Sequence, residues 1–383
     1  MPETSINGLS SFGQSAWLDN INRSLLESGR LREMIAKGLR GLTSNPTIFE
    51  KAIGLSSIYD QNISKLAKNG KSTFEIYDEL TIKDIQDASD LFLKVYKQTK
   101  GLDGYVSLEV NPKLANDAKR TVLEGLRLYN KVSRPNLMLK IPATDEGFIA
   151  VEELVSRGLN VNVTLIFSSE QYLGSFRAYA KGLKRFFDSG GDIRKVHSVA
   201  SVFVSRIDTL VDAQLSEIAD SIFDSGKKQE LERLKGKAAV SNSKVIYKEY
   251  LAILASPEFK SLKEKGANIQ RVLWASTSTK NPAYSDIKYV VELIAKNSVN
   301  TLPEETFSAF LDHGRVKEAL TADASEALKV VFDLKNLGID LNLVCGRLLK
   351  DGLTAFEKSF LSLLAAIEIK QKVLSSASYM VKS

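Results

Sequence analysis

The stretch NLMLKIPATDEGFIAVEELVSRGLNVNVTLIF, residues 136–167, gives the clearest indication of the fold. It opens and closes with short runs of apolar residues, and an amphipathic segment, residues 146–156, lies between them. Asp145 adds negative charge at the start of that segment and Gly158 follows its end, as is typical of a helix. Two strands joined through a helix lie parallel in one sheet, so the stretch predicts a βαβ unit.

The same alternation continues along almost the whole chain. Strands are expected at residues 16–18, 38–43, 105–110, 136–141, 160–167, 199–204, 271–275 and 298–302. Helices are expected at residues 24–37, 73–98, 112–131, 146–156, 169–189, 206–235, 244–254 and 284–296. This pattern predicts an α/β fold with a parallel sheet, either open and doubly wound or closed, and eight strands favour a (β/α)8 TIM barrel.

Some parts of the chain are longer than a barrel needs. The second and third strands are separated by about 60 residues and the sixth and seventh by about 65, so both connections should hold extra helices. Beyond the eighth strand, residues 316–336 and 346–373 are also amphipathic. Because no linker-like composition precedes them, residues 1–383 are expected to form one barrel domain, with residues 304–383 packed on it as a C-terminal helical cap.

Composition restricts the class of protein. The chain has 52 basic and 46 acidic residues, a net charge of +6, and the two signs are interspersed, which suits an anionic small molecule better than nucleic acid. Its single cysteine, Cys345, excludes an internal disulfide and favours the cytoplasm. No uncharged run reaches the roughly 20 apolar residues of a membrane helix, so no membrane partner is expected. The composition leaves the oligomeric state open.

Several familiar motifs are missing. Residues 70–72 read Gly-Lys-Ser, but the glycine that a phosphate loop needs five positions earlier is Lys65. The chain also has no dinucleotide-binding glycine pattern, and two histidines with one cysteine form no zinc motif. Neither a metal site nor a cofactor is therefore expected.

Side-chain alternation directs one lysine into the barrel. In the strand over residues 136–141, Met138 and Lys140 should face inward, because neighbouring side chains of a strand point to opposite faces. A lysine at the end of a strand can also bend its ammonium group out to water. This strand by itself leaves both interpretations open.

Neighbouring strands supply further polar side chains. Residues with inward parity are Ser107 and Glu109, then Asn160, Asn162 and Thr164, then Ser201 and Phe203, whereas Val161, Val163 and Leu165 take the opposite parity. Asp19 follows the first strand and Asn45 follows the second. A purely structural barrel interior is mostly branched and apolar, so this polar set predicts a site.

The set suits one kind of chemistry. In a partly dry barrel the ammonium form of a lysine is disfavoured, and a neutral amine can attack a carbonyl to form a Schiff base; Lys140 is the candidate. The iminium accepts electrons from a breaking carbon–carbon bond when a carboxylate removes the proton of the adjacent hydroxyl, and Asp19 and Glu109 are the candidates. The other carboxylate, paired with Thr164, can hold the water that enters and leaves the imine.

Four motifs in order resemble the transaldolase family. They are GLTSNPTIF at residues 41–49, LMLKIPAT at 137–144, NVTLIFS at 162–168 and SVFVSR at 201–206. Residues 348–367 also look like the longer bacterial branch of that family. The resemblance implies a TIM barrel of the class I aldolase type.

The resemblance also implies catalytic roles. Lys140 matches the Schiff-base lysine, and Asp19 matches the acid that takes and returns the substrate hydroxyl proton. Glu109 and Thr164 match the pair that positions the catalytic water.

Substrate-binding roles follow in the same way. Asn45 and Asn162 match amides that hold substrate hydroxyls and the imine region. Ser201 and Phe203 match the wall beside the lysine, and Arg206 matches a phosphate-binding arginine.

The seventh strand departs from the shorter form of the family. Ser276 carries over, but Ser278 stands where an arginine would bind phosphate. We assign that role to Lys280, which can equally be a solvated loop lysine.

The expected reaction transfers a dihydroxyacetone unit from sedoheptulose 7-phosphate to glyceraldehyde 3-phosphate, giving erythrose 4-phosphate and fructose 6-phosphate, in the non-oxidative pentose phosphate pathway. One alternative is a fructose 6-phosphate aldolase, a similar barrel that carries an amide in place of Glu109 and a tyrosine in place of Phe203. Another is a phosphosugar-binding barrel without catalysis, although such a protein has no use for an inward Lys140 beside two acids.

Overall fold

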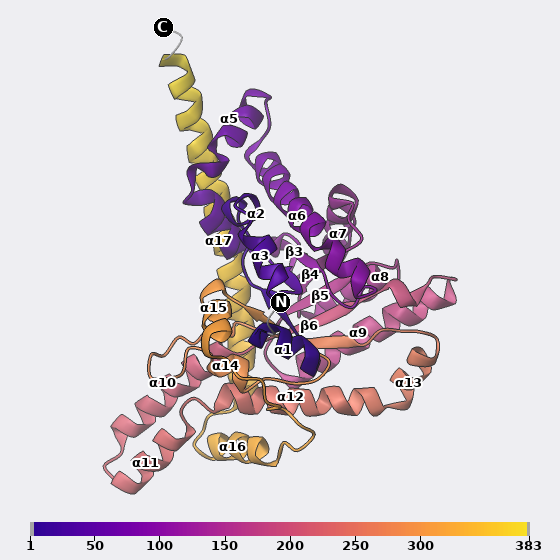
Figure 1. The fold of residues 1–383 in the computed structure, drawn as a ribbon. Helices are drawn as coiled ribbons and strands as arrows, with labels where there is room; N and C mark the ends of the chain where they lie inside the picture. Colours follow the sequence, from indigo (N-terminus) through magenta and orange to yellow (C-terminus); the bar gives the residue numbers. More distant parts are fainter. Residues whose placement is uncertain (1–3, 381–383) are drawn as a thin grey trace.

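Eight parallel strands form a closed barrel in chain order. Figure 1 shows the chain with its helices arranged around the strands. The computed structural model describes the backbone of residues 4–380 and the side chains of residues 4–374. The strands are β1 (Gln14–Leu18), β2 (Gly41–Thr43), β3 (Val106–Glu109), β4 (Leu137–Pro142), β5 (Val161–Ile166), β6 (Ser198–Phe203), β7 (Gln270–Ala275) and β8 (Ser298–Leu302). The predicted TIM barrel is confirmed.

Helices surround the barrel. Before β4 lie α1 (Ser5–Phe12), α2 (Arg23–Glu27), α3 (Arg30–Ala36), α4 (Pro46–Phe49), η1 (Glu50–Gly54), η2 (Ser57–Tyr59), α5 (Asp60–Lys68), α6 (Thr73–Gln98), η3 (Pro112–Leu114) and α7 (Ala118–Val132). Between β4 and β7 lie α8 (Asp145–Val155), α9 (Ser169–Asp188), η4 (Ile193–Lys195), α10 (Ser205–Ser221), α11 (Ser225–Leu234), α12 (Ala238–Ala255) and α13 (Pro257–Glu264). The last are α14 (Lys288–Val291), α15 (Glu304–His313), α16 (Ser325–Asn336) and α17 (Leu341–Met380).

The two long connections hold the extra helices that their lengths predict. The β2–β3 connection contains α4, α5 and α6, and the β6–β7 connection contains α10 to α13. Expected helices 24–37 and 206–235 are each split in two, whereas 244–254 and 346–373 are parts of the longer α12 and α17.

Strand β2 is shorter than expected, because Gly38 and Leu39, predicted as its first residues, form the turn that closes the end of α3. Gly38 has φ +113°, a conformation that favours glycine and commonly ends helices. Its N–H bonds the Ile35 carbonyl, and the Leu39 N–H bonds the Met34 carbonyl. The register of β2 therefore starts with Gly41 opposite Trp17 of β1 and Leu42 opposite Val106 of β3.

Strand β5 breaks its own alternation near the end. Its register with β6 shifts between Val163 and Ile166, and Leu165 has φ +60°. The expectation that Leu165 simply continues the outward row of Val161 and Val163 is therefore wrong, since a bulge turns the strand there.

Two predicted helices are shorter in the structure than expected. The helix expected over residues 284–296 is reduced to the four residues of α14, and the one expected over 316–336 begins only at Ser325. The Ile294 carbonyl accepts a hydrogen bond from the Ala319 N–H at 2.9 Å instead of one from its own segment. Tertiary pairing between the two segments thus replaces helical hydrogen bonds.

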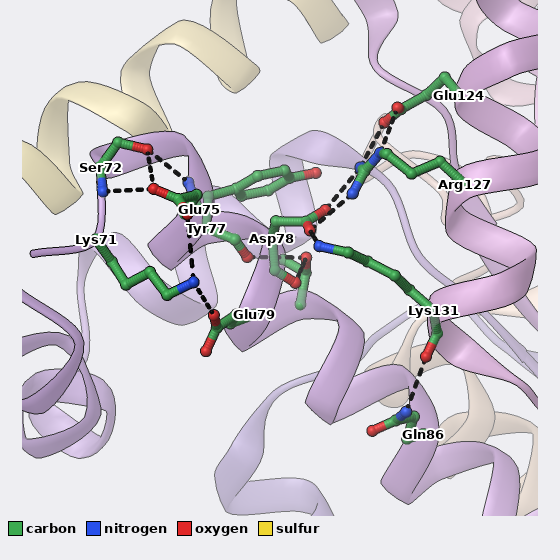
Figure 2. Close-up of polar contacts among 11 residues, drawn as sticks. Lys71, Ser72, Glu75, Tyr77, Asp78, Glu79, Gln86, Glu124, Arg127 and Lys131 are labelled. Carbon is green, nitrogen blue, oxygen red and sulfur yellow. Dashed lines mark hydrogen bonds and ion pairs between the residues drawn. The ribbon is translucent and has the colours of Figure 1, made fainter. Parts of the chain in front are cut away.

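An ionic cluster joins α6 to α7 (Figure 2). Arg127 donates two hydrogen bonds to the Asp78 carboxylate, at 2.7 and 2.8 Å, and Lys131 donates a third at 2.6 Å. Burial opposes ionisation of Asp78, but the two cations hold its pKa below the usual value. Because α6 packs on β3 and α7 on β4, the cluster supports the two strands that carry Glu109 and Lys140.

The amino end of the barrel is closed by a buried ion pair. Arg271 lies 2.9 Å from Asp103, and each side chain is 7% exposed. The Ser15 hydroxyl donates a hydrogen bond to Asp103 and accepts one from Arg271. Burial, together with the charge of Arg271, lowers the pKa of His197 to about 4 at this end. These contacts fill the described part of this end of the barrel, and active sites of TIM barrels lie at the opposite, carboxyl end of the strands.

Helix α17 lies across the carboxyl ends of the strands. It contacts α4, η1, α5, α6, α10, η3 and β5, and Figure 1 shows it in yellow, running beside α5. The assignment of residues 1–383 to a single domain, with 304–383 as its cap, stays a prediction. None of the helices within residues 4–380 is long and apolar enough to cross a membrane.

Candidate active site

Three predicted site residues form a row across neighbouring strands. Glu109 of β3 is the register partner of Lys140 of β4, which is in turn the partner of Asn162 of β5. Register partners in a parallel sheet point to the same face. All three side chains are buried, so they meet inside the barrel as the alternation predicts.

Lys140 is held inside the barrel by oxygen atoms. Its Nζ donates a hydrogen bond to the Ser44 carbonyl at 3.1 Å and lies 3.5 Å from Oε2 of Glu109. Only 4% of the side chain is exposed. Lys140 therefore does not bend out to water, which was the alternative interpretation.

Glu109 is a buried acid with unused hydrogen-bonding capacity. Burial raises its pKa to about 7, the nearby Lys140 opposes that rise, and the charge of Asp19 adds to it. Both carboxylate oxygens of Glu109 and the hydroxyl of Thr164 are buried and have no hydrogen-bond partner within the described residues. Such unpaired buried groups are costly, so they suit a site that accepts a water or a substrate hydroxyl.

Asp19 lies at the end of β1, where it is only half-buried. The Thr43 hydroxyl donates to its Oδ1 at 2.8 Å and lies 3.0 Å from the hydroxyl of Thr301. Asp19 also affects the pKa values of Glu109 and Arg206, so its charge acts on both. A cavity of about 430 Å³ reaches Asp19 from the direction of α2 and η1.

Amides and hydroxyls continue the polar surface. The Asn162 amide donates to the Ser107 hydroxyl at 3.1 Å and accepts from the Ser201 hydroxyl at 2.6 Å. Asn45 caps α4, because its side-chain oxygen accepts from the Ile48 N–H at 3.0 Å. Its amide N–H2 group is then the part that can bind a ligand.

An aromatic and a cationic residue lie at the end of β6 and form another side of the site. The guanidinium carbon of Arg206 lies 5.3 Å from the centre of the Phe203 ring. Burial lowers the pKa of Arg206, and Asp19 partly offsets that effect. Ser276 has φ +54°, and its hydroxyl lies 3.1 Å from that of Ser205. A partly buried arginine with serine hydroxyls nearby is suited to bind an anionic group of a ligand.

The structure does not bring Lys280 into this group. It is exposed on the segment after β7, and within residues 4–380 no hydrogen bond or ion pair joins it to Arg206 or Ser276. Its role as a phosphate ligand stays a prediction.

Sequence reasoning missed two contacts to Lys140. One partner is the carbonyl of Ser44, and backbone groups leave no residue-type signal. The other is Phe356 of α17, whose ring centre lies 5.8 Å from Nζ. The amphipathic pattern of the last helix predicts a packed face without saying which residue reaches the site.

Other features of the described chain lie away from this group. A larger cavity, of about 930 Å³, lies among α10, α11, α12 and α16 and contains none of the predicted site residues. Within residues 4–380 no cluster of three or more His, Cys, Asp or Glu side chains is arranged to hold a metal ion.

Comparisons with known proteins agree with one another. Residues 16–367 match the family model described as Transaldolase/Fructose-6-phosphate aldolase. A transaldolase of Trichodesmium erythraeum is 48% identical over 370 residues, which cover 96% of this chain and 97% of the relative. A transaldolase of Thiobacillus denitrificans is 44% identical over 94% of this chain and 98% of its own length. Transaldolase 2 of Nostoc punctiforme is 42% identical over 95% and 97%.

Proposed function

The chain belongs to the transaldolase family, in its longer bacterial branch, and we propose that Lys140 performs the transfer reaction by forming a Schiff base with the substrate. It is a transaldolase of the pentose phosphate pathway, and its substrates are sugar phosphates. The observation that carries the proposal is the buried contact between Lys140 and Glu109, together with the unpaired Thr164 hydroxyl on the neighbouring strand β5.

Imine formation is the first step of the proposed mechanism. The neutral amine of Lys140 attacks the ketone carbon of the donor, and the adduct then loses water to give an iminium. Glu109, with a pKa of about 7, both takes up and returns a proton near neutral pH. The free Thr164 hydroxyl and Glu109 oxygens supply hydrogen bonds for the water that leaves.

Carbon–carbon cleavage is the second step. Asp19, oriented by the Thr43 hydroxyl, removes the proton of the substrate hydroxyl on the carbon that will leave. The bond between carbons 3 and 4 breaks, its electron pair enters the iminium to form an enamine, and an aldose phosphate departs. The iminium is the electron sink, so the proposed reaction uses no cofactor.

Transfer completes the cycle. The enamine attacks the aldehyde of an acceptor such as glyceraldehyde 3-phosphate, and Asp19 returns the proton to the new hydroxyl. Water then adds to the iminium and releases fructose 6-phosphate, while Lys140 regains its amine. With sedoheptulose 7-phosphate as donor, the first product is erythrose 4-phosphate.

The remaining residues are assigned to binding. The amides of Asn45 and Asn162 bind hydroxyls of the dihydroxyacetone unit, with Ser201 and Phe203 as the adjacent wall. Arg206, Ser276 and Lys280 bind the phosphate, which carries close to two negative charges near neutral pH.

The alternatives predict different behaviour without an acceptor. A transferase given only fructose 6-phosphate releases glyceraldehyde 3-phosphate for a single turnover and then stalls, because dihydroxyacetone stays on the lysine. An aldolase continues to release product, and a non-catalytic sugar-binding barrel releases none. Glu109 and Phe203 favour the transferase, and a burst that resumes on addition of erythrose 4-phosphate is the expected result.

We further propose that the enzyme works in the cytoplasm and without a nucleic-acid partner. The single cysteine supports a reducing compartment. The dispersed charge supports a small anionic substrate. A fractionation experiment that recovers the protein outside the cytoplasm would contradict the first point.

A further inference from the structure

Helix α17 approaches the mouth of the barrel at a glycine. A Cβ atom at Gly352 would lie 2.9 Å from Cδ2 of Leu165 and 3.7 Å from an Arg206 nitrogen. Leu165 is the residue with φ +60° at the bulge of β5. The bulge and the glycine together let the helix lie closer to the strand end than a larger residue would.

This approach brings an aromatic ring over the lysine. Phe356 follows Gly352 by one helical turn and is 3% exposed, and its ring centre lies 5.8 Å from Nζ of Lys140. A ring face attracts a cation but offers no hydrogen bond strong enough to hold water. On this side, therefore, the reacting nitrogen is covered by apolar surface.

The helix is fixed in place by polar contacts along its length. The Ser359 hydroxyl lies 2.9 Å from that of Thr47 in α4, and Lys370 donates to Asp60 of α5 at 2.7 Å. Near the amino end of α17, the Cys345 thiol contacts the Phe167 carbonyl at 3.2 Å. The ring of Phe356 is thus carried by a helix that is anchored to α4, α5 and the end of β5, and not by a loop.

We infer that Phe356 shields the lysine-bound intermediate from water and so favours transfer to an aldose over release of free dihydroxyacetone. The inference rests on the Schiff-base role proposed for Lys140. Phe356 would act as a shielding residue, by limiting access to a reaction that other groups perform.

The reaction that competes with transfer is hydrolysis of the lysine-bound intermediate, and the Phe356 ring would slow it. After cleavage, the enamine can take up a proton at carbon to form an iminium. Water then adds to the iminium carbon, the carbon–nitrogen bond breaks, and the products are dihydroxyacetone and the free Lys140 amine. Transfer needs the intermediate to survive until an acceptor arrives, so entry of water beside the nitrogen shortens its lifetime.

The test is a comparison of two rates in each variant. One is the release of glyceraldehyde 3-phosphate from fructose 6-phosphate without acceptor, measured after the first-turnover burst. The other is transfer with erythrose 4-phosphate present. For Phe356→Ala we expect the ratio of the first rate to the second to rise about tenfold, because the truncated side chain leaves space for water next to the nitrogen. Phe356→Leu should give an intermediate ratio.

Phe360 provides the matched control. It lies one turn further along α17 and is 2% exposed, but its ring packs 5.2 Å from Tyr77, a residue drawn in Figure 2, and not on Lys140. Phe360→Ala should destabilise the helix by a similar amount and leave the ratio unchanged.

The outcomes separate this inference from the proposed function. An unchanged ratio in Phe356→Ala, or an equal rise in Phe360→Ala, would overturn the shielding role while the wild-type burst still supports Lys140. If Phe356→Ala does not fold, Phe356→Leu decides, and a wild-type ratio in it contradicts the inference. A wild-type enzyme without any burst would overturn the proposed mechanism and the shield together.

Discussion

Lys140 and Glu109 are register partners on adjacent strands, and their charged ends lie 3.5 Å apart with only 4% of each side chain exposed. Burying such a pair costs desolvation free energy that mutual attraction rarely recovers, so a buried ion pair is weak evidence for a stabilising role. Glu109 also keeps both oxygens without a hydrogen bond within the described residues. The pair is better explained as part of a reaction site than as part of the core.

The raised pKa of Glu109 predicts a pH-dependent stability difference. Its pKa is about 7 in the folded state against an ordinary 4.5, so between these pH values the folded chain retains a proton that the unfolded chain has lost. This group therefore makes the wild type less stable as pH rises through that window. Glu109→Gln does not titrate, so its free energy of unfolding relative to wild type should rise by about 3 kcal/mol from pH 4.5 to pH 7.5.

Urea unfolding of both proteins at several pH values measures that difference. A constant difference across the window would mean that Glu109 titrates at its ordinary pKa.

A double substitution should shift the enzyme toward simple aldol cleavage. Glu109→Gln with Phe203→Tyr introduces the two residue types that the resemblance attributes to fructose 6-phosphate aldolases. Continuous release of dihydroxyacetone from fructose 6-phosphate, with no aldose present, should then exceed that of wild type. Absence of any increase would show that these two positions do not decide between transfer and release.

Substitution of two cationic residues tests how the enzyme binds the substrate phosphate. Arg206→Ala and Lys280→Ala should each weaken binding of phosphorylated substrates by roughly 1.5 to 3 kcal/mol, the loss of a charge-assisted hydrogen bond. Unphosphorylated fructose should be nearly unaffected. Lys260→Ala, an exposed lysine on α13, is the control.

The comparison of KM values for fructose 6-phosphate and fructose is the measurement. If KM values in Lys280→Ala move in parallel or not at all, Lys280 is only a solvated residue and the second phosphate ligand lies elsewhere.

The barrel was predictable because it depends on local patterns. The alternation of short apolar runs with amphipathic segments indicates eight strands, and the structure has eight. The predicted ends of helices and strands were wrong where they depend on the backbone conformation of one residue or on a hydrogen-bond partner distant in the sequence. Gly38 ends a helix instead of starting a strand, and the Ile294 carbonyl bonds Ala319 from a later segment. Neither effect is visible in the hydrophobic pattern of one segment.

The site was predictable to the extent that it follows strand parity. Glu109, Lys140 and Asn162 meet because register partners share a face, and period-two alternation indicates that face. Phe356 could not be found in this way, because its position depends on how closely α17 packs at Gly352. The phosphate-binding role of Lys280 remains a prediction, since the conformation of its loop places this side chain in solvent.

Lys140→Arg should retain the fold and lose nearly all turnover. Arginine keeps the charge and the bulk, but it is not deprotonated in proteins and supplies no neutral amine. Far-ultraviolet circular dichroism and thermal unfolding check the fold, and the transfer assay checks turnover. Comparable activity in this variant would contradict the Schiff-base mechanism.

Chemical trapping shows whether Lys140 carries the substrate as a Schiff base. The enzyme is mixed with fructose 6-phosphate, reduced with sodium borohydride, digested and analysed by mass spectrometry. We predict a reduced dihydroxyacetone adduct on the peptide that contains Lys140, and none in Lys140→Arg treated in the same way. An adduct on another lysine, or inactivation without any adduct, would contradict the proposed role of Lys140.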